Sequence, residues 1–171
     1  MILATTRRLF LRPLQPDDLE PLIPILSDSA VMEYSTTGPL SKEKIQEWLT
    51  TIIAEYELPG FSVWAIILKE DNKLIGFCGI RPVEIDGRTE IELIFRLATA
   101  YWGEGYATEA SLGVIEYAFN TLAINSVIAV VDPRNTRSLS VLEKLHMSHE
   151  KDSIYKEFPV RVYRLSKFKR H

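Results

Sequence analysis

The residues most able to bind a ligand form a short segment with two glycines, residues 102–108, which reads Trp-Gly-Glu-Gly-Tyr-Ala-Thr. Small side chains stand here where a predicted strand gives way to a predicted helix, so the backbone can turn tightly and expose several N–H groups. The first N–H groups of a helix have no intrahelical acceptor, and the helix dipole adds partial positive charge there. The segment therefore predicts a diphosphate site that requires no lysine. An ordinary tight turn into a helix is the alternative.

The elements before this segment are predicted to be strands. Residues 61–68 are aromatic and β-branched, and Asp71-Asn72 supplies a turn. Residues 74–80 follow, and Asp86-Gly87 then gives a strong hairpin signal before residues 90–97. Three consecutive strands joined by short polar turns predict an antiparallel meander.

The elements after the segment predict a different arrangement. Residues 105–122 carry apolar side chains at helical spacing, and residues 127–131 are apolar at every position, as in a strand covered on both faces. Strand, helix and buried strand make a βαβ crossover, which is expected to be right-handed. A further helix over residues 135–145 and a final strand pair around Ile154 and Val162 complete the chain.

The first sixty residues supply one strand and two helices. Residues 9–14 alternate like a half-buried strand, and residues 16–20 read as a helix start with early acidic residues. Ser41 begins a second helix, in which one face gathers the large apolar side chains Ile45, Trp48, Leu49, Ile52 and Ile53. The sequence as a whole predicts one α+β domain over residues 1–171, with a mixed sheet that contains one parallel junction.

The overall composition argues against several classes of protein. The 20 basic and 23 acidic side chains give a net charge of −3, whereas proteins that coat nucleic acid usually show a basic excess. No apolar run approaches the roughly 20 residues that a membrane span needs, and the apolar stretch at the start is too short for a signal peptide. We therefore expect a cytoplasmic protein with no nucleic-acid or membrane partner. Cys78, His146, His149 and His171 show no metal-ligand spacing, so no metal is expected.

Taken together, three segments resemble one protein family. Residues 102–107 resemble the pyrophosphate loop of the GNAT superfamily of N-acetyltransferases, whose pattern is Gln/Arg-x-x-Gly-x-Gly/Ala. The longer string Tyr-Trp-Gly-Glu-Gly-Tyr-Ala-Thr-Glu-Ala resembles the branch that includes the ribosomal-protein N-acetyltransferases, in which Trp102 is a branch feature. Residues 7–18 are similar to that branch's opening strand and helix, and residues 132–145 to its Asn-x-x-Ser segment and the helix that follows. The resemblance spans nearly the whole chain.

The resemblance implies a fold and a co-substrate. The implied fold is a GNAT-like mixed, mostly antiparallel sheet of about seven strands with flanking helices, in which strand 90–97 splays from the parallel strand 127–131. The implied co-substrate is acetyl-CoA, with its pantetheine arm in that gap and a backbone N–H near Phe95 or Leu97 aimed at the acetyl carbonyl. The expected binding residues are Phe95, Leu97, Gly103, Glu104, Gly105, Tyr106, Ala107, Thr108, Asn135, Ser138 and Lys144.

Some of these binding roles have open alternatives. Asn135 either hydrogen-bonds the pantetheine amide or caps the helix, a common role for asparagine. Arg134, Arg137 and Lys144 either meet the phosphates of the coenzyme or are simply solvated.

The resemblance also implies an acid and a base. An amine with a pKa of about 10 is mostly protonated at pH 7, so a base is useful. Glu92 is the expected base because the superfamily often places its catalytic glutamate in this strand. Glu90, on the same face and about 6.6 Å away, is its rival, and an ordinary surface carboxylate is the alternative. Leu142 stands where many GNAT enzymes have the tyrosine that protonates the leaving thiolate, so Ser138 is the expected acid, or else a structural helix residue.

The end of that helix departs from the family pattern. The family usually has Gly-Phe where this chain has His146 and Met147. Met147 can fill the same apolar pocket because methionine is adaptable. His146 lacks the freedom of glycine at positive φ, so we expect this helix end to differ in shape.

The implied activity is transfer of an acetyl group from acetyl-CoA to a primary amine by direct attack in a ternary complex. A protein N-terminus, a polyamine, an amino acid and an aminoglycoside all remain open as acceptors, and the protein is either a monomer or a homodimer. One alternative is a non-catalytic acyl-CoA-binding regulatory module, against which the retained Glu92, Asn135 and Ser138 argue. The other is a mononucleotide-binding protein, but no complete Gly-x-x-x-x-Gly-Lys-Ser/Thr or Gly-x-Gly-x-x-Gly is present.

Overall fold

The computed structural model describes residues 1–169, so His171 lies outside the described residues. The strands are β1 (Ala4–Thr5), β2 (Leu9–Pro13), β3 (Val63–Leu68), β4 (Lys73–Ile85), β5 (Arg88–Leu97), β6 (Ser126–Val131), β7 (Ser148–Tyr155) and β8 (Phe158–Ser166). The α-helices are α1 (Leu19–Leu26), α2 (Lys42–Glu55), α3 (Tyr106–Asn120) and α4 (Thr136–Lys144).

One mixed sheet connects these strands in the order β1-β2-β3-β4-β5-β6-β8-β7. Within the described residues β5 and β6 form the parallel pair, and every other neighbouring pair is antiparallel. The predicted α+β fold is therefore confirmed, including the meander before residue 98 and the βαβ crossover through α3. The sheet of residues 1–169 has eight strands, one more than the seven expected, because the short β1 pairs with β2.

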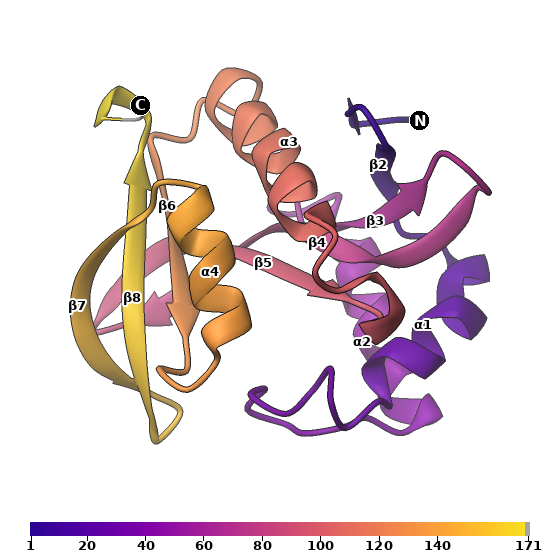
Figure 1. The fold of residues 1–171 in the computed structure, drawn as a ribbon, viewed down its shortest axis with the longest axis horizontal. Helices are drawn as coiled ribbons and strands as arrows, with labels where there is room; N and C mark the ends of the chain where they lie inside the picture. Colours follow the sequence, from indigo (N-terminus) through magenta and orange to yellow (C-terminus); the bar gives the residue numbers. More distant parts are fainter. Residues whose placement is uncertain (170–171) are drawn as a thin grey trace.

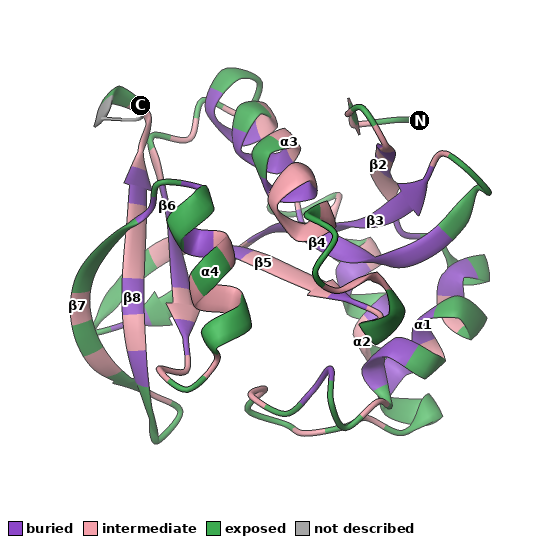
Figure 2. Ribbon diagram, viewed as in Figure 1, coloured by how far each residue is buried: buried purple, intermediate pink, exposed green. Residues whose placement is uncertain are grey.

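Helices cover both faces of the sheet, and α3 and α4 lie in front of it while α2 lies behind (Figure 1). Alternate residues of β3 therefore enter different cores. Trp64 and Ile66 pack with α3 and α4, whereas Val63 and Ala65 pack with α1 and α2. β3 is buried at every position. A strand covered on both faces needs apolar residues throughout, which explains why its sequence, Val-Trp-Ala-Ile-Ile-Leu, has no polar residue. Figure 2 shows the corresponding buried stripe on α3, with exposed residues on the side turned to solvent.

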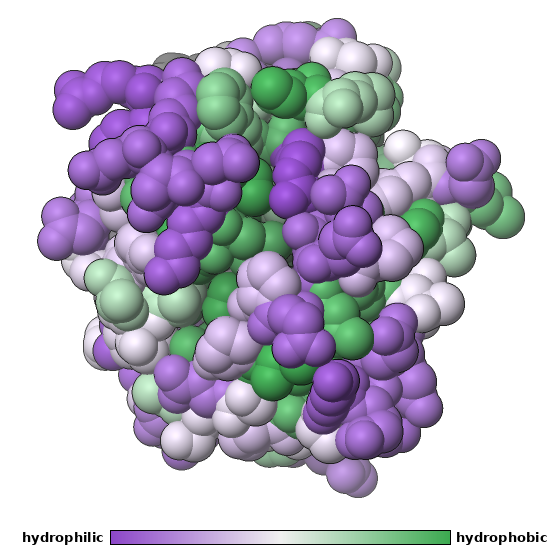
Figure 3. Space-filling view, turned by 90° about the vertical axis from the view of Figure 1, so that its right-hand side faces the viewer, coloured by the Kyte–Doolittle hydropathy of each residue, from purple (hydrophilic) through white to green (hydrophobic). Residues whose placement is uncertain are grey.

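The predicted amphipathic helix after Ser41 forms as α2. The Ser41 side chain accepts a hydrogen bond from the Lys44 backbone N–H at 3.2 Å, which caps the helix. Ile45, Leu49 and Ile52 are fully buried against the sheet, one helical turn apart. The face at the right-hand side of Figure 1 shows apolar side chains near its centre, with polar side chains around them (Figure 3).

The parallel junction between β5 and β6 is short. In the described chain the two strands pair at one bridge, Glu92 opposite Ile128. β5 continues for five residues beyond Glu92, to Leu97, whereas β6 ends at Val131. The strands therefore separate beyond Glu92, and this splay, which the sequence resemblance implies, opens the sheet toward the start of α3.

The end of α4 corrects one expectation from the sequence. His146 adopts the left-handed conformation itself, with φ of 61°. The Met147 N–H then donates to the Leu142 carbonyl at 3.1 Å, and the His146 N–H donates to the Glu143 carbonyl at 3.0 Å. This is the hydrogen-bond pattern of the usual glycine-terminated helix, so the expectation of a different shape is wrong. Met147 is buried in the core with α3, as predicted.

None of the described helices is long and apolar enough to cross a membrane. No group of three or more His, Cys, Asp or Glu side chains within residues 1–169 is arranged to hold a metal ion.

Candidate active site

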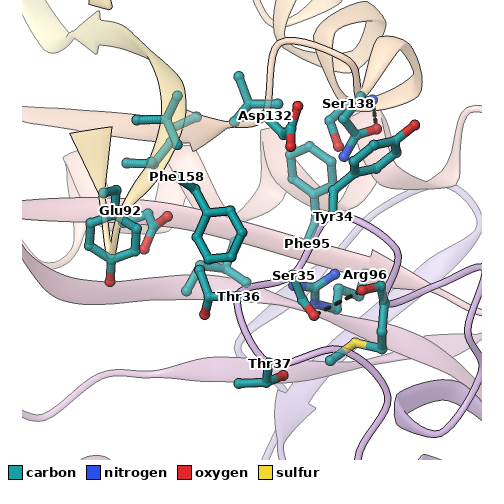
Figure 4. A pocket seen from close by; sticks show the side chains of 18 of the residues that line it. Tyr34, Ser35, Thr36, Thr37, Glu92, Phe95, Arg96, Asp132, Ser138 and Phe158 are labelled. Carbon is teal, nitrogen blue, oxygen red and sulfur yellow. Dashed lines mark hydrogen bonds between the residues drawn. The ribbon is translucent and has the colours of Figure 1, made fainter. Parts of the chain in front are cut away.

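A cavity of about 380 Å³ lies where β5 and β6 separate. Residues 92–96 of β5 and residues 129–132 at the end of β6 form its floor and one wall. The connection between α1 and α2 contributes residues 32–37, and the β7–β8 hairpin contributes Tyr155, Lys156 and Phe158. Figure 4 shows the labelled side chains around this space, with Glu92 and Ser138 on opposite sides of the view.

Glu92 presents a carboxylate to this cavity. Burial raises the pKa of Glu92 to about 7, although the positive charges of Arg81, Arg96 and Lys156 act in the opposite direction. No hydrogen bond or ion pair joins the Glu92 carboxylate to another described residue. The carboxylate is therefore open to a ligand in the cavity, and it exists in both protonation states near neutral pH.

The backbone of β5 also has free donors at the gap. The Ala98 N–H donates to the Ile75 carbonyl of β4 at 2.9 Å. Residues of an antiparallel pair alternate between exchanging hydrogen bonds with the partner and pointing away from it. The N–H groups of Phe95 and Leu97 therefore point away from β4 and toward the side of β6. Consistently, the Leu97 carbonyl accepts a hydrogen bond from the Trp102 indole at 3.0 Å rather than from β4.

The glycine segment begins α3 with unbonded backbone donors. Gly103 and Gly105 have φ of 76° and 82°, a conformation that side chains with a Cβ rarely adopt. In the described chain no group accepts a hydrogen bond from the backbone N–H groups of residues 103–108. Such a row of free N–H groups at a helix N-terminus is suited to a diphosphate, so the segment fits the diphosphate of a coenzyme.

A second cavity of about 80 Å³ lies between this segment and α4. Leu97, Trp102 and Ala107 line one side of it, and Asn135, Arg137 and Ser138 line the other. The Arg137 guanidinium stacks on the Trp102 ring, 3.6 Å from its centre. Trp102 therefore holds the Arg137 guanidinium beside the glycine segment, where its positive charge would attract an anionic ligand.

The start of α4 brings two more predicted residues to the site. The Asn135 side-chain oxygen accepts a hydrogen bond from the Ser138 N–H at 3.2 Å, so Asn135 caps α4. Ser138 lines both cavities, and its hydroxyl has no hydrogen-bond partner among the described residues. Leu142, one turn further, is buried beneath it.

The residues predicted to bind acetyl-CoA or to act in catalysis differ in which cavity they line. The larger cavity is lined by Glu92, Phe95, Asn135 and Ser138, and Leu97 and Ala107 line the smaller one. The other loop residues, Gly103, Glu104, Gly105, Tyr106 and Thr108, line neither of these two cavities and offer their backbone beside the smaller one. Lys144 is exposed in the last turn of α4 and also lines neither cavity. Arg134 forms an ion pair with Asp132 at 2.8 Å.

The sequence analysis did not identify three cations at the larger cavity, Arg81, Arg96 and Lys156. Arg96 lies four residues after Glu92, so strand alternation places both side chains on one face. The sequence therefore already contained a signal for Arg96. Lys156 lies at the tip of a hairpin sixty residues away, and no local pattern connects it with β5.

The chain is similar to several known proteins. Residues 8–148 match the acetyltransferase (GNAT) domain family. The uncharacterized protein YkkB of Bacillus subtilis strain 168 is 32% identical over 159 residues, which are 92% of each chain. The uncharacterized N-acetyltransferase p20 of Bacillus licheniformis is 31% identical over 173 residues, or 96% of this chain and 95% of p20.

A solved structure shares the fold. It is the ribosomal L7/L12 α-N-protein acetyltransferase RimL in complex with coenzyme A, with a TM-score of 0.82, 16% identity, and coverage of 97% of this chain and 98% of that one. At this identity the likeness concerns the fold alone. The domain match and the two relatives carry the assignment: the chain belongs to the GNAT family of acetyl-CoA-dependent acetyltransferases.

Proposed function

We propose that the protein transfers the acetyl group of acetyl-CoA to a primary amine, by direct attack of the amine in a ternary complex, with Glu92 as the base. The acceptor is a protein N-terminus or a small amine. The observation that carries this proposal is the Glu92 carboxylate, which faces the cavity at the splay without a partner among the described residues and has a pKa raised to about 7 by burial.

The raised pKa of Glu92 suits proton transfer at neutral pH. A base is most effective when its pKa lies near the operating pH, because it is then partly ionised and still basic enough to take a proton. An alkyl ammonium with a pKa of about 10 enters such a site charged. The ionised Glu92 first attracts the ammonium and then accepts its proton, which frees the nitrogen lone pair for attack.

The β5 backbone supports the attack by holding the acetyl carbonyl. The N–H groups of Phe95 and Leu97 point into the gap, and either can donate to the carbonyl oxygen as it gains negative charge. A fixed donor of this kind typically lowers the barrier by about 3 kcal/mol. The backbone N–H groups of residues 103–108 and the Asn135 amide hold the rest of the coenzyme, so that the thioester lies beside β5.

Ser138 is the proposed acid for the departing sulfur. Its hydroxyl faces both cavities and has no acceptor in the described chain, so it is free to donate a proton or a hydrogen bond to the thiolate. A thiol with a pKa of about 8.5 leaves with modest help, so Ser138 contributes less than Glu92. Leu142 stands one turn below and has no proton to give.

A thiol-release assay tests the proposal. The protein is incubated with acetyl-CoA and a panel of primary amines, and free thiol is measured against a control without amine. Amine-dependent release, with the acetylated amine identified by mass spectrometry, is the expected result. Release that is independent of every amine would contradict amine acetylation, because the enzyme would then transfer the acetyl group to water or to another acceptor.

Thermal unfolding tests the coenzyme site separately. Acetyl-CoA at 100 times its dissociation constant should stabilise the fold by about 2.7 kcal/mol, a shift of several degrees in Tm. NADH and ATP at the same concentration should shift Tm much less, because each lacks the pantetheine arm that fills the gap between β5 and β6. Equal shifts from all three ligands would argue against the coenzyme site.

A further inference from the structure

Four cationic side chains of residues 1–169 line the larger cavity, and they differ in whether a carboxylate of the protein neutralises them. Arg81 donates two hydrogen bonds to Glu55, at 2.9 and 2.8 Å, so its charge is compensated. Arg134 is compensated in the same way by Asp132, through contacts of 3.1 and 2.8 Å. These two arginines line the cavity but are already bound to carboxylates. They are therefore poor candidates for binding an anionic group of a substrate.

Arg96 lines both cavities without such compensation. One of its nitrogens, Nη1, donates to the Val31 carbonyl at 3.2 Å. No carboxylate of the described chain forms an ion pair with Arg96. Each buried side-chain N or O atom within residues 1–169 has a hydrogen-bond partner. The remaining Arg96 nitrogens, which have none, are therefore accessible from the cavity and free to donate.

Lys156 provides a second uncompensated charge from the opposite side. It lies at the tip of the β7–β8 hairpin, lines the same cavity, and acts electrostatically on Glu92 together with Arg96. Its ammonium lies 5.3 Å from the centre of the Tyr155 ring, and no carboxylate of the described chain forms an ion pair with it. The remaining acidic side chain at the cavity, Glu33, is exposed, and its charge acts on Arg134. Once Glu92 is reserved for an ammonium, Arg96 and Lys156 are therefore the unpaired cations of the described cavity, against the exposed carboxylate of Glu33.

We propose that the acceptor is a small amine that also carries a carboxylate, as an amino acid does, and that Arg96 and Lys156 bind this carboxylate while Glu92 receives the amine. The assignment rests on the proposed function, because it uses Glu92 as the site of the ammonium. Glu92 and Arg96 lie on one face of β5, about 13 Å apart along the strand, and their charges act on each other. The long Arg96 side chain must extend toward Glu92 for one small zwitterion to contact both charges. The cavity volume of about 380 Å³ lies in the range of small-molecule sites.

Charge also argues against a polyamine acceptor. An amine that brings its own ammonium adds one positive charge to a region that already has Arg96 and Lys156 uncompensated. Each further ammonium would add repulsion from Arg96 and Lys156, with the exposed Glu33 as the remaining carboxylate of the described cavity to offset it, and unpaired like charges exclude wrong ligands. A carboxylate on the substrate would instead be attracted by Arg96 and Lys156.

Matched pairs of amines test the acceptor class. Phenylalanine is compared with 2-phenylethylamine, and methionine with 3-(methylthio)propylamine, so that the members of each pair differ by the carboxylate alone. Spermidine and short peptides with acidic or neutral N-termini complete the panel. The expected result is a kcat/KM at least about tenfold higher for the carboxylate member of a pair, which is the usual effect of one charge-assisted hydrogen bond.

Variants of the two cations locate the carboxylate. Arg96→Gln should raise the KM for the preferred amino acid at least about tenfold, and leave the KM for its decarboxylated partner and for acetyl-CoA unchanged. Lys156→Asn should act in the same direction. It lies on an exposed turn with φ of 48°, which asparagine tolerates, so folding is not at risk. Lys151→Gln, on the same hairpin but outside the cavity, is the matched control and should change none of these values.

The possible outcomes separate this inference from the proposed function. If amines without a carboxylate, or spermidine, are the better substrates, the inference is overturned while amine acetylation stands. Equal losses for both members of a pair in Arg96→Gln and Lys156→Asn would overturn it as well, because the cations would then serve the coenzyme or the fold. Preference for acidic peptides would overturn the assignment to a small amine. Absence of thiol release with every amine would overturn both proposals.

Discussion

Glu90 and Glu92 lie on the same face of β5, but Arg164 binds the carboxylate of Glu90, with contacts of 3.2 and 2.5 Å, and leaves that of Glu92 open. Glu90 is thus part of an ion-pair network that Glu150 completes. Glu92, two residues further, reaches the point where β6 departs, and it faces the cavity. An ion-paired carboxylate is a weak base because the pairing favours its ionised form. The geometry therefore favours Glu92 over Glu90 as the proposed base.

The pH dependence of catalysis should follow the ionisation of Glu92. Because the pKa of Glu92 is raised to about 7, kcat/KM should fall on the acidic side of that value as the carboxylate takes up its proton. Glu92→Gln should lower turnover near pH 7 by roughly 10²-fold or more. The deficit should shrink toward the pKa of the amine, where solution supplies the neutral acceptor. Steady-state rates from pH 5 to 10 measure both effects.

Glu90→Gln is the matched control for this experiment. The substitution has the same chemistry on the same face of β5, but it removes a charge that Arg164 neutralises rather than one that faces the cavity. Turnover should stay close to that of the parent protein, with a modest loss of stability. If Glu90→Gln were the inactive variant instead, the assignment of the base would be wrong by two residues.

The partly desolvated carboxylate of Glu92 should also lower the stability of the fold. Its folded-state pKa of about 7 lies above the ordinary value of 4.5, so the native state holds the proton more tightly than the unfolded chain. The penalty is absent below pH 4.5, grows as pH rises to 7, and is constant above. We expect Glu92→Gln to raise the free energy of unfolding by about 2 kcal/mol at pH 8, which allows for one side of the carboxylate facing water, and to leave it unchanged at pH 4. Urea unfolding at both pH values measures the difference, and equal effects at both would contradict it.

The glycine segment can be tested by a pair of matched substitutions. Gly105 and Gly87 have similar positive φ, 82° and 73°, so Gly105→Ala and Gly87→Ala should each lose about 1–2 kcal/mol of stability. Only Gly105→Ala should weaken acetyl-CoA binding, by about tenfold, because its new Cβ disturbs the N–H groups that begin α3. Calorimetric titration with acetyl-CoA separates the two variants. Equal affinities would place the diphosphate elsewhere.

The left-handed residue at the end of α4 offers a stabilising change. His146 is exposed, lines neither described cavity, and holds φ of 61° at a position that most often carries glycine. His146→Gly should therefore raise the free energy of unfolding by about 1 kcal/mol, since it removes the cost of the Cβ in this conformation. Activity should be unchanged. A variant with the same or a lower Tm would show that His146 makes a compensating contact.

Much of the fold follows from local patterns in the sequence. Asp86-Gly87 predicted the hairpin between β4 and β5, and both residues take the positive φ that such a turn requires. The uniformly apolar residues 127–131 predicted a strand covered on both faces, and Ser41 predicted the start of α2. These features depend on backbone preferences and on periodicity over a few residues, so they can be read without knowledge of distant contacts.

The electrostatics of the site depend on contacts that no local pattern contains. Glu90 and Glu92 are equivalent in the sequence, and they differ because β8 brings Arg164 to one and the splay of β6 opens a cavity at the other. The pKa of Glu92 is set by burial under segments from distant parts of the chain, with Lys156 among them. The sequence alone determined the family, the order of the elements and the candidate residues, because these are properties of the chain read in order. The tertiary structure decided which carboxylate is free and which cations face it, because desolvation and charge pairing depend on what folding places side by side.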